Sequence, residues 1–480
     1  MADILIRNGT VIAIDPQRRI IADGAVAITG TRIVAVGPSE EVARDHPARE
    51  VIDARSMVIM PGLIDSHAHA GHGLIKTLGG GRSDLWYRAC QGAYTVGSTP
   101  EFWHAEAQLA ALERLRFGVT TGVSLLGGGD SVMRTDEPDY GDAHMEGVLG
   151  IGTRSVVAVG TTRPPHPLTY ARWKGSERVD YPVSFEDQFS TSRTLVDRWH
   201  RTHDERLHLA MLTPTLHQDN LEAPGAEEAI AQSRIVKSFA EDHGLVFMQD
   251  GHTRGSIRIA NDIGILGPRT LLSHATGLDD DEIAICAQSG TRIAHNPSAI
   301  ASILARCPVP ELLQAGVLVA IGSDATAPDR SGDMFRHMQQ CMHYHRTHFH
   351  DPSWLPPGKV LEMCTIDGAR ALGLEREIGS LEPGKKADII LVDLRRPHLY
   401  PANMPEFRVT YFANGNDVHT VLVGGRVLLR DRNPVHVDQD AVLDAAQRET
   451  DLMIDRLGLH DLMRTPAMFW SNARDTDLIE

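Results

Sequence analysis

Eight short apolar runs alternate with longer amphipathic segments through the middle of this 480-residue chain. The runs are residues 58–65, 119–126, 154–162, 207–215, 245–250, 270–274, 292–295 and 317–324. The segments between them, such as 101–116, 227–243 and 280–290, carry apolar residues at helical spacing. Eight strands that alternate with helices predict an α/β protein with a closed parallel (β/α)8 barrel of the TIM type.

The two ends of the chain carry a different pattern. Residues 1–57 hold short strands of alternating polarity with Gly, Asn and Asp at the breaks, and similar strands return in 376–436. Such small groups of strands are marginal alone. We therefore predict one small composite β-sandwich, built from both ends around a barrel of residues 58–375. Residues 437–480 predict a helical tail that packs on the barrel or on a second subunit.

Composition and charge exclude several classes of partner. Asp and Glu outnumber Lys and Arg by 63 to 47, which argues against nucleic acid or a membrane surface as the main partner. The chain shows no secretory signal and no apolar stretch near the roughly 20 residues of a membrane span. Its five cysteines are scattered and form no CxxC pair. We expect a cytoplasmic protein that acts on a small molecule.

Ionisable residues stand where the predicted barrel strands end, which is where barrels carry their chemistry. The first strand leads into His67 and His69. Alternate residues of an extended segment face the same way, so both imidazoles would point at one metal ion. The eighth strand ends at Asp324, which would complete the site and accept a proton from a bound water; its alternative role is to cap the following helix.

Further histidines follow other strands of the barrel. His274 and His295 end the sixth and seventh strands, and each alone would more often be a core or loop histidine. Together with the residues of the first and eighth strands they favour a functional site. His295, His217 and His166 are candidate substrate contacts, with an ordinary loop role as the alternative for the last two.

The sequence resembles a known superfamily through several motifs that occur in its order. These are PGLIDSHAHAGHG, LLSH, IAHNPSA, PVPELLQAGVLVAIGSDA and IGSLEPGKKADIILVD. They resemble the amidohydrolase superfamily, in the branch of cytosine deaminases and triazine hydrolases and near phenylurea and thiocarbamate hydrolases. The similarity runs from about residue 3 to 430. It implies a distorted barrel with a composite β-sandwich and one divalent metal ion, zinc first, with iron, cobalt or manganese as alternatives.

The resemblance also implies roles for individual residues. His67 and His69 would be metal ligands, Asp324 a ligand and proton acceptor, and His274 a group that polarises the substrate. Relatives carry a ligand histidine at the end of the fifth strand and a proton-shuttling glutamate three residues later. This chain has Gln249 and His252 at those positions. Three alternatives stay open for the third ligand: Gln249 binds the metal, His252 binds it, or His274 joins the ligands. We favour Gln249 or His252. His252 is also our candidate for a catalytic group.

The segment 337–350 is rich in histidine. His337, Cys341 and His345 share a face at helical spacing, which would suit a second metal site. The superfamily places a helix here outside the barrel mouth, so we predict a structural or interface helix instead.

These residues predict hydrolysis by a metal-activated water. Because the deaminase glutamate is missing, we expect first the cleavage of a non-peptide C–N bond of the amide, urea or carbamate type. The alternative is a deaminase or dechlorinase of an aminated N-heterocycle of the purine, pterin or triazine type. A third possibility is a non-catalytic binding protein on an inherited barrel. The tail helix and the habit of the superfamily suggest a homo-oligomer.

Overall fold

The apolar runs of the sequence form the strands of a barrel, because almost every residue in them is buried. The computed structural model describes residues 1–127, 132–302, 305–324 and 330–471. Its eight-stranded sheet is parallel throughout. In sheet order its strands are β15 (Val319–Ile321), β14 (Arg292–His295), β13 (Thr270–Ser273), β12 (Phe247–Gln249), β11 (Leu207–Leu212), β8 (Arg154–Gly160), β7 (Val119–Leu125) and β6 (Leu63–Asp65). The predicted barrel is confirmed.

Helices connect the strands and cover the barrel. They are α2 (Ser83–Gly92), α3 (Pro100–Arg116), α4 (Pro138–Ile151), α5 (Phe185–Trp199), α6 (Gln218–Glu222), α7 (Ala226–Asp242), α8 (Ser256–Asp262), α9 (Asp280–Ser289), α10 (Pro297–Ser302), α11 (Val309–Gln314), α12 (Met334–Phe349), α13 (Pro357–Met363) and α14 (Ile366–Ala371). Local sequence sets their ends: α9 begins at a capping box of Asp279 and Glu282 and ends at Gly290, whose φ is +71°. No helix in the described part of the chain is both long and apolar enough to cross a membrane.

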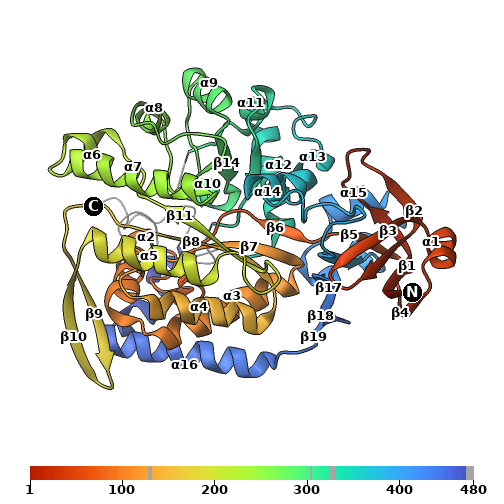
Figure 1. Cartoon of the computed structure of the whole chain (residues 1–480), viewed down its shortest axis with the longest axis horizontal. Coiled ribbons are helices and arrows are strands. Elements are labelled where there is room, and N and C mark those ends of the chain that lie inside the picture. The colour runs from red at the N-terminus through yellow and green to blue at the C-terminus, as the bar shows by residue number, and fades with distance from the viewer. Residues whose placement is uncertain (128–131, 303–304, 325–329, 472–480) are drawn as a thin grey trace.

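Both chain ends contribute to a second sheet, as predicted. Its strands are β1 (Ala2–Ile12), β2 (Ile20–Thr29), β3 (Arg32–Pro38), β4 (Ala48–Asp53) and β5 (Met57–Pro61) from the N-terminal end, and β16 (Ile389–Asp393), β17 (Val418–Val423), β18 (Arg426–Arg430) and β19 (Asn433–Pro434) from the other. Antiparallel pairing of β5 with β16 joins the two parts. The helices α1 (Ser39–Asp45) and α15 (Pro405–Tyr411) accompany this sheet, which lies at one end of the molecule (Figure 1).

The expected strand 58–65 is two strands that serve different sheets. β5 ends at Pro61 in the composite sheet, and β6 begins at Leu63 in the barrel. Gly62 lies between them, against Thr120 of β7. A Cβ atom on Gly62 would stand 2.1 Å from the Thr120 Oγ1 atom. The crossing from one sheet to the other therefore depends on a residue without a side chain.

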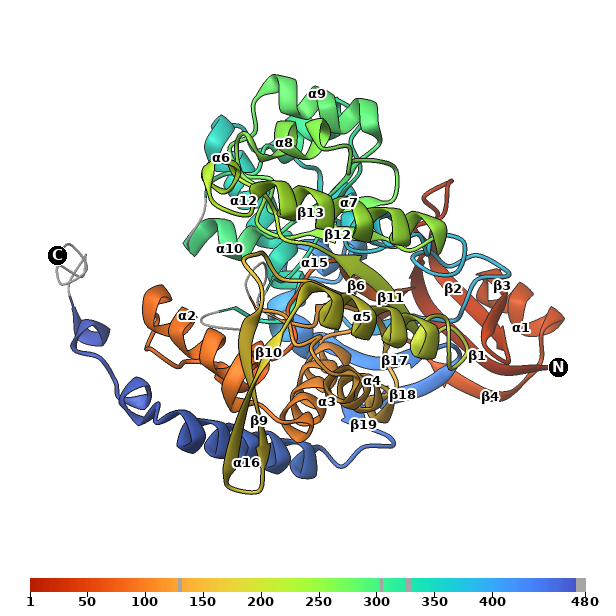
Figure 2. The same ribbon diagram turned by 60° about the vertical axis from the view of Figure 1, so that its left-hand side comes forward.

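Two elements outside the barrel complete the fold. The hairpin of β9 (Leu168–Lys174) and β10 (Glu177–Val183) was not foreseen; it projects beside the helix α16 (Gln439–Leu457) (Figure 2). The buried Arg134 helps to dock it, because its guanidinium donates to the Ala171 carbonyl of β9. α16 packs on α3 of the same chain, which is the first of the two placements expected for the tail. Residues 472–480 of that tail lie outside the described residues.

The barrel closes between β6 and β15 around the buried carboxylate of Asp65. Its Oδ1 accepts from the Ser323 backbone N–H at 2.8 Å, and its Oδ2 accepts from the Ser323 hydroxyl at 2.7 Å. Arg114 of α3 donates to the same Oδ2 from Nε and Nη2, at 3.2 and 3.1 Å. A backbone hydrogen bond from Ser66 to Ile321 runs alongside. One carboxylate thus joins the first strand to the segment that follows the last.

The Asp65→Asn substitution tests this closure. Asparagine keeps one acceptor oxygen but removes the charge opposite Arg114 and turns an amide N–H₂ group toward Ser323. We expect the free energy of unfolding to fall by about 3 kcal/mol, because a buried cation loses its partner. Urea unfolding followed by circular dichroism measures the change. The control is Asp53→Asn, in an exposed pair with Arg55, with an expected cost below about 1 kcal/mol. Equal losses in the two variants would contradict the role given to Asp65.

The Gly62→Ala substitution tests the crossing between the sheets. The new methyl group would overlap Thr120, so we expect a loss of about 2 kcal/mol or more in stability. The control is Gly358→Ala, because a Cβ atom there meets no described atom within 4 Å. That change should leave stability unchanged or slightly higher. Thermal unfolding midpoints of both variants compare the two positions, and an unchanged midpoint for Gly62→Ala would contradict the packing described here.

Candidate functional site

His67 and His69 follow β6 on an extended segment and face the same space, with ring centroids 5.1 Å apart. The His69 Nδ1 atom lies 2.9 Å from the Gly127 carbonyl oxygen. A carbonyl only accepts, so Nδ1 carries the proton and donates it. The Nε2 atom of His69 is therefore directed into the site, and once it has lost its proton it offers the lone pair that a metal ligand requires.

Asp324 faces the two histidines from the end of β15. Backbone hydrogen bonds tie it to them: its N–H donates to the His67 carbonyl at 2.8 Å, and its carbonyl accepts from the His69 N–H at 2.9 Å. Its Oδ1 stands 3.6 Å from His67 Nε2 and 3.3 Å from His69 Nε2. Asp324 has a φ of +70°, an uncommon conformation for aspartate that is often held in place at functional sites.

Asp250 is a second carboxylate in this group. It comes directly after β12, and its Oδ1 lies 3.2 Å from the Nε2 atoms of both His67 and His274. Its Oδ2 lies 3.3 Å from His69 Nε2. Gly251, the next residue, has a φ of +87° and turns the chain away. Sequence reasoning missed Asp250; the available signal was a carboxylate placed directly after a barrel strand.

Gln249 does not point into this group. Its amide nitrogen donates to the Pro214 carbonyl at 2.8 Å and to the Thr213 hydroxyl at 3.3 Å. Because the Pro214 oxygen only accepts, the Gln249 amide oxygen must face His252, whose Nε2 is 3.2 Å away. His252 then carries its proton on Nε2, while its Nδ1 faces the Ser256 hydroxyl at 2.8 Å. Burial lowers the pKa of His252 to about 3, so its ring is neutral.

His274 joins the group from the end of β13. Its Nε2 is 3.2 Å from Asp250 and 3.8 Å from the Asp324 carboxylate. Like Asp324 it has a left-handed backbone, with a φ of +68°. Asn296 approaches the same Nε2 at 3.5 Å from the end of β14. His274 therefore lies among the possible ligands, one of the alternatives left open by the sequence.

The three candidate substrate contacts occupy different surroundings. His217 comes just before α6, and its Nδ1 lies 3.4 Å from the Thr253 hydroxyl. His166 approaches Glu228 at 3.7 Å in the segment between β8 and β9. His295 is fully buried beside His345 of α12. The structure thus places His295 with the histidine-rich helix rather than with His67 and His69.

Two further features near the site were not foreseen. The Arg330 Nε lies 3.6 Å from Asp324 Oδ2, whereas His67 and His69 face the other carboxylate oxygen, Oδ1. The His72 ring stacks on His69 with centroids 4.7 Å apart, and Tyr94 hydrogen-bonds to His72 Nδ1. The arginine lies in a loop with no strand-end signal, and His72 belongs to the same histidine-rich motif as His67 and His69.

The electrostatics of the group suit a divalent cation. Burial favours the neutral acid at Asp324, but the charge of His274 and hydrogen bonds from His67 and His69 hold its pKa well below the usual value. Burial likewise opposes the charged form of His69, yet the Asp250 and Asp324 carboxylates raise its pKa to about 10.

The donor atoms of the group also fit a metal ion. Two sets of three, His67–His69–Asp324 and His67–Asp250–His274, each bring their ligand atoms within 4.8 Å of one another. The buried Nε2 of His67 faces carboxylate oxygens of Asp250 and Asp324, at 3.2 and 3.6 Å. Imidazole and carboxylate are ordinary ligands of zinc and similar ions, so these residues can hold a divalent metal ion.

Solved structures share the fold over nearly the whole chain. An adenosine deaminase from Xanthomonas campestris with bound zinc superposes with a TM-score of 0.81 at 23% identity, covering 95% of this chain and 99% of that one. Atrazine chlorohydrolase from Arthrobacter aurescens, complexed with zinc, gives a TM-score of 0.76 at 24% identity, covering 94% and 100%. At these identities the likeness confirms the barrel with its composite domain.

Curated relatives and family models identify the chain further. A 5-methylthioadenosine/S-adenosylhomocysteine deaminase of Syntrophobacter fumaroxidans is 30% identical, over 92% of this chain and 96% of the relative. A 5'-deoxyadenosine deaminase of Methanosarcina mazei is 28% identical, over 95% and 100%. The model of a bacterial imidazolonepropionase-like composite domain matches residues 24–48, and that of the amidohydrolase family matches residues 58–428. The chain belongs to the amidohydrolase family and is a hydrolase of carbon–nitrogen bonds other than peptide bonds.

Proposed function

We propose that this protein is a metal-dependent deaminase of an aminated nitrogen heterocycle, with adenine nucleosides as the first substrate class. The observation that carries the proposal is the convergence of three imidazole Nε2 atoms on two carboxylates at the barrel strand ends, the buried Asp324 and the partly buried Asp250. Full-length relatives named as deaminases of adenine nucleosides support the substrate class. They favour the alternative drawn from the sequence over the amide, urea or carbamate cleavage expected first.

The ligands that we propose differ from the sequence expectation. His67, His69, His274, Asp250 and Asp324 would hold the ion, while Gln249 would stay bonded to Pro214 and His252. We propose zinc, since the donor set suits it and both structural neighbours named above contain it. When bound, the ion supplies Lewis-acid chemistry that makes a water molecule a nucleophile at neutral pH.

Asp324 is the proposed proton acceptor. Its low pKa keeps it ionised at neutral pH, with Oδ1 toward the histidines and Oδ2 toward Arg330. The carboxylate would take a proton from the attacking water and deliver it to the leaving amino group, so that water and the amine become the oxo product and ammonia. The guanidinium of Arg330 would keep this carboxylate in place between transfers.

His252 is proposed as a positioning residue rather than a proton shuttle. Both of its ring nitrogens are engaged, Nε2 by Gln249 and Nδ1 by Ser256. The ring braces the Gln249 amide and with it the end of β12 that carries Asp250. His217, which approaches Thr253 next to His252, stays our candidate for a substrate contact.

We expect Asp250→Ala to lose metal and Gln249→Leu to keep it. Removing a direct ligand should weaken metal affinity by more than about 100-fold, whereas loss of a supporting amide should weaken it by about 10- to 100-fold. Elemental analysis after dialysis against a chelator series measures both variants beside the wild type. Loss of metal from Gln249→Leu with retention in Asp250→Ala would restore Gln249 as the ligand.

The deaminase proposal predicts ammonia release from aminated heterocycles. The zinc-loaded protein should release ammonia from adenosine, 5'-deoxyadenosine or 5-methylthioadenosine, or from an aminated pterin or triazine. Asp324→Asn should lower the rate by at least about 100-fold, because no carboxylate then accepts the proton. This variant also controls for contaminating deaminases. Turnover of a phenylurea, amide or carbamate panel without turnover of any heterocycle would refute deamination.

The proposal also covers the cellular compartment and the oligomeric state. We propose a cytoplasmic enzyme, supported by five buried cysteines that are all free thiols. We also propose a homo-oligomer, supported by two apolar side chains that α16 leaves exposed on opposite sides of its buried face, Leu443 and Leu452.

A further inference from the structure

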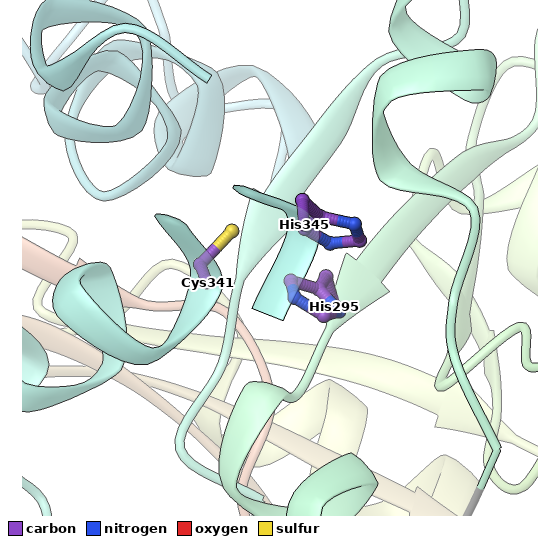
Figure 3. A group of neighbouring side chains, drawn as sticks. All are labelled: His295, Cys341 and His345. Atoms are coloured by element: carbon purple, nitrogen blue, oxygen red, sulfur yellow. The ribbon is translucent and has the colours of Figure 1, made fainter. Parts of the chain in front are cut away.

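A cysteine and two histidines meet inside the molecule on the side of β14 that faces α12. His295 is the last residue of β14, while Cys341 and His345 lie four residues apart on α12 and so share a face. Figure 3 shows the three side chains gathered in one space. The thiol sulfur and one nitrogen of each ring all lie within 4.8 Å of one another.

This cluster is buried and its polar atoms are unsatisfied. The three residues are 1%, 0% and 1% exposed, in the order of the chain. All four ring nitrogens of His295 and His345 lack a hydrogen-bond partner within the described chain. Buried polar atoms in folded proteins nearly always have one. Two buried rings whose nitrogens are all unpaired, each with one nitrogen within 4.8 Å of the same thiol sulfur, therefore point to a ligand.

A neighbouring histidine on the same helix shows the contrast. His337 is also fully buried, but its Nδ1 faces the Ser298 hydroxyl at 2.8 Å and its Nε2 donates to the Ser331 carbonyl at 2.7 Å. His337 is thus a satisfied structural residue. About two turns further along the helix, His345 has no such partners among the described residues.

We propose that His295, Cys341 and His345 form a second metal site, which binds a thiophilic ion, zinc or cuprous copper. The site is separate from the carboxylate-containing group of the proposed deaminase and does not depend on its function. It replaces our expectation that segment 337–350 is only a structural or interface helix.

The donor set explains this choice of ion. Two neutral imidazoles and a thiolate suit zinc and cuprous ions, whereas calcium and magnesium require oxygen ligands. Burial lowers the pKa of His345 to about 4, so the ring is neutral and offers a lone pair. The Cys341 thiol would lose its proton when the sulfur–metal bond forms, so binding releases one proton to solvent.

A bound ion would link α12 to the barrel. His295 is followed by Asn296, which approaches the His274 Nε2 atom at 3.5 Å. The cross-link would therefore hold the strand end that supports one wall of the functional site. We expect the ion to be acquired during folding and retained, because the cluster is closed to solvent.

Metal content and a spectroscopic signature test the site in the full-length protein. Protein produced with zinc or copper should contain about two equivalents of metal per chain, and elemental analysis shows which ion fills the second site. Protein produced with cobalt should show a sulfur-to-cobalt charge-transfer band. The carboxylate-containing group offers no sulfur, so the band reports only this cluster.

Two variants and two controls test whether the sulfur-to-cobalt band comes from this cluster. Cys341→Ser and His345→Gln should each lose the band and about one equivalent of metal. His343→Gln, exposed on the same helix, and Cys90→Ser, a buried thiol elsewhere, should keep both.

A wild-type protein with one equivalent of metal and no cobalt–thiolate band would overturn the proposal, whatever the variants do. Loss of the band in Cys90→Ser but not in Cys341→Ser would overturn it as well.

Discussion

The carboxylate of Asp65 is the interaction on which the rest of the structure depends. It joins residues 258 positions apart in the chain, because both of its oxygens accept from Ser323 and one also accepts from Arg114. His67 lies two residues after Asp65, and Asp324 directly follows Ser323. Barrel closure and assembly of the site are therefore one event: the hydrogen bonds that close the sheet also bring an imidazole and a carboxylate face to face.

The strands and part of the site were predictable because they follow local rules. Apolar runs marked all eight barrel strands, and polar residues at strand ends marked His67, His69, His274 and Asp324. Asp250 was not predicted as a site residue because tertiary contacts set its orientation. The Gln249 amide before it is held by the Pro214 carbonyl, and the chain turns at Gly251 after it. The hairpin β9–β10 was not predicted because its docking depends on the buried Arg134, which lies far from it in sequence.

The histidine-rich helix α12 shows the same limit of prediction from sequence. Spacing alone placed His337, Cys341 and His345 on one face, and it could not tell a satisfied residue from an unsatisfied one. The difference comes from neighbours supplied by other segments: Ser298 and Ser331 pair with His337, whereas His295 meets His345 with no partner for either ring in the described chain. Only the folded arrangement separates a structural helix from a candidate ligand set.

The exchange at the end of β12 also changes the charge of the site. The superfamily pattern has a neutral imidazole ligand at this strand, with a glutamate three residues later. Here Gln249 and His252 pair with each other, and Asp250 takes the place facing His67 and His274. With the proposed ligands, two carboxylates would balance the charge of a divalent ion, whereas one carboxylate would leave the centre positive. Such a neutral centre would attract anionic substrates less than a positive one would, which agrees with the uncharged nucleosides and heterocycles proposed as substrates.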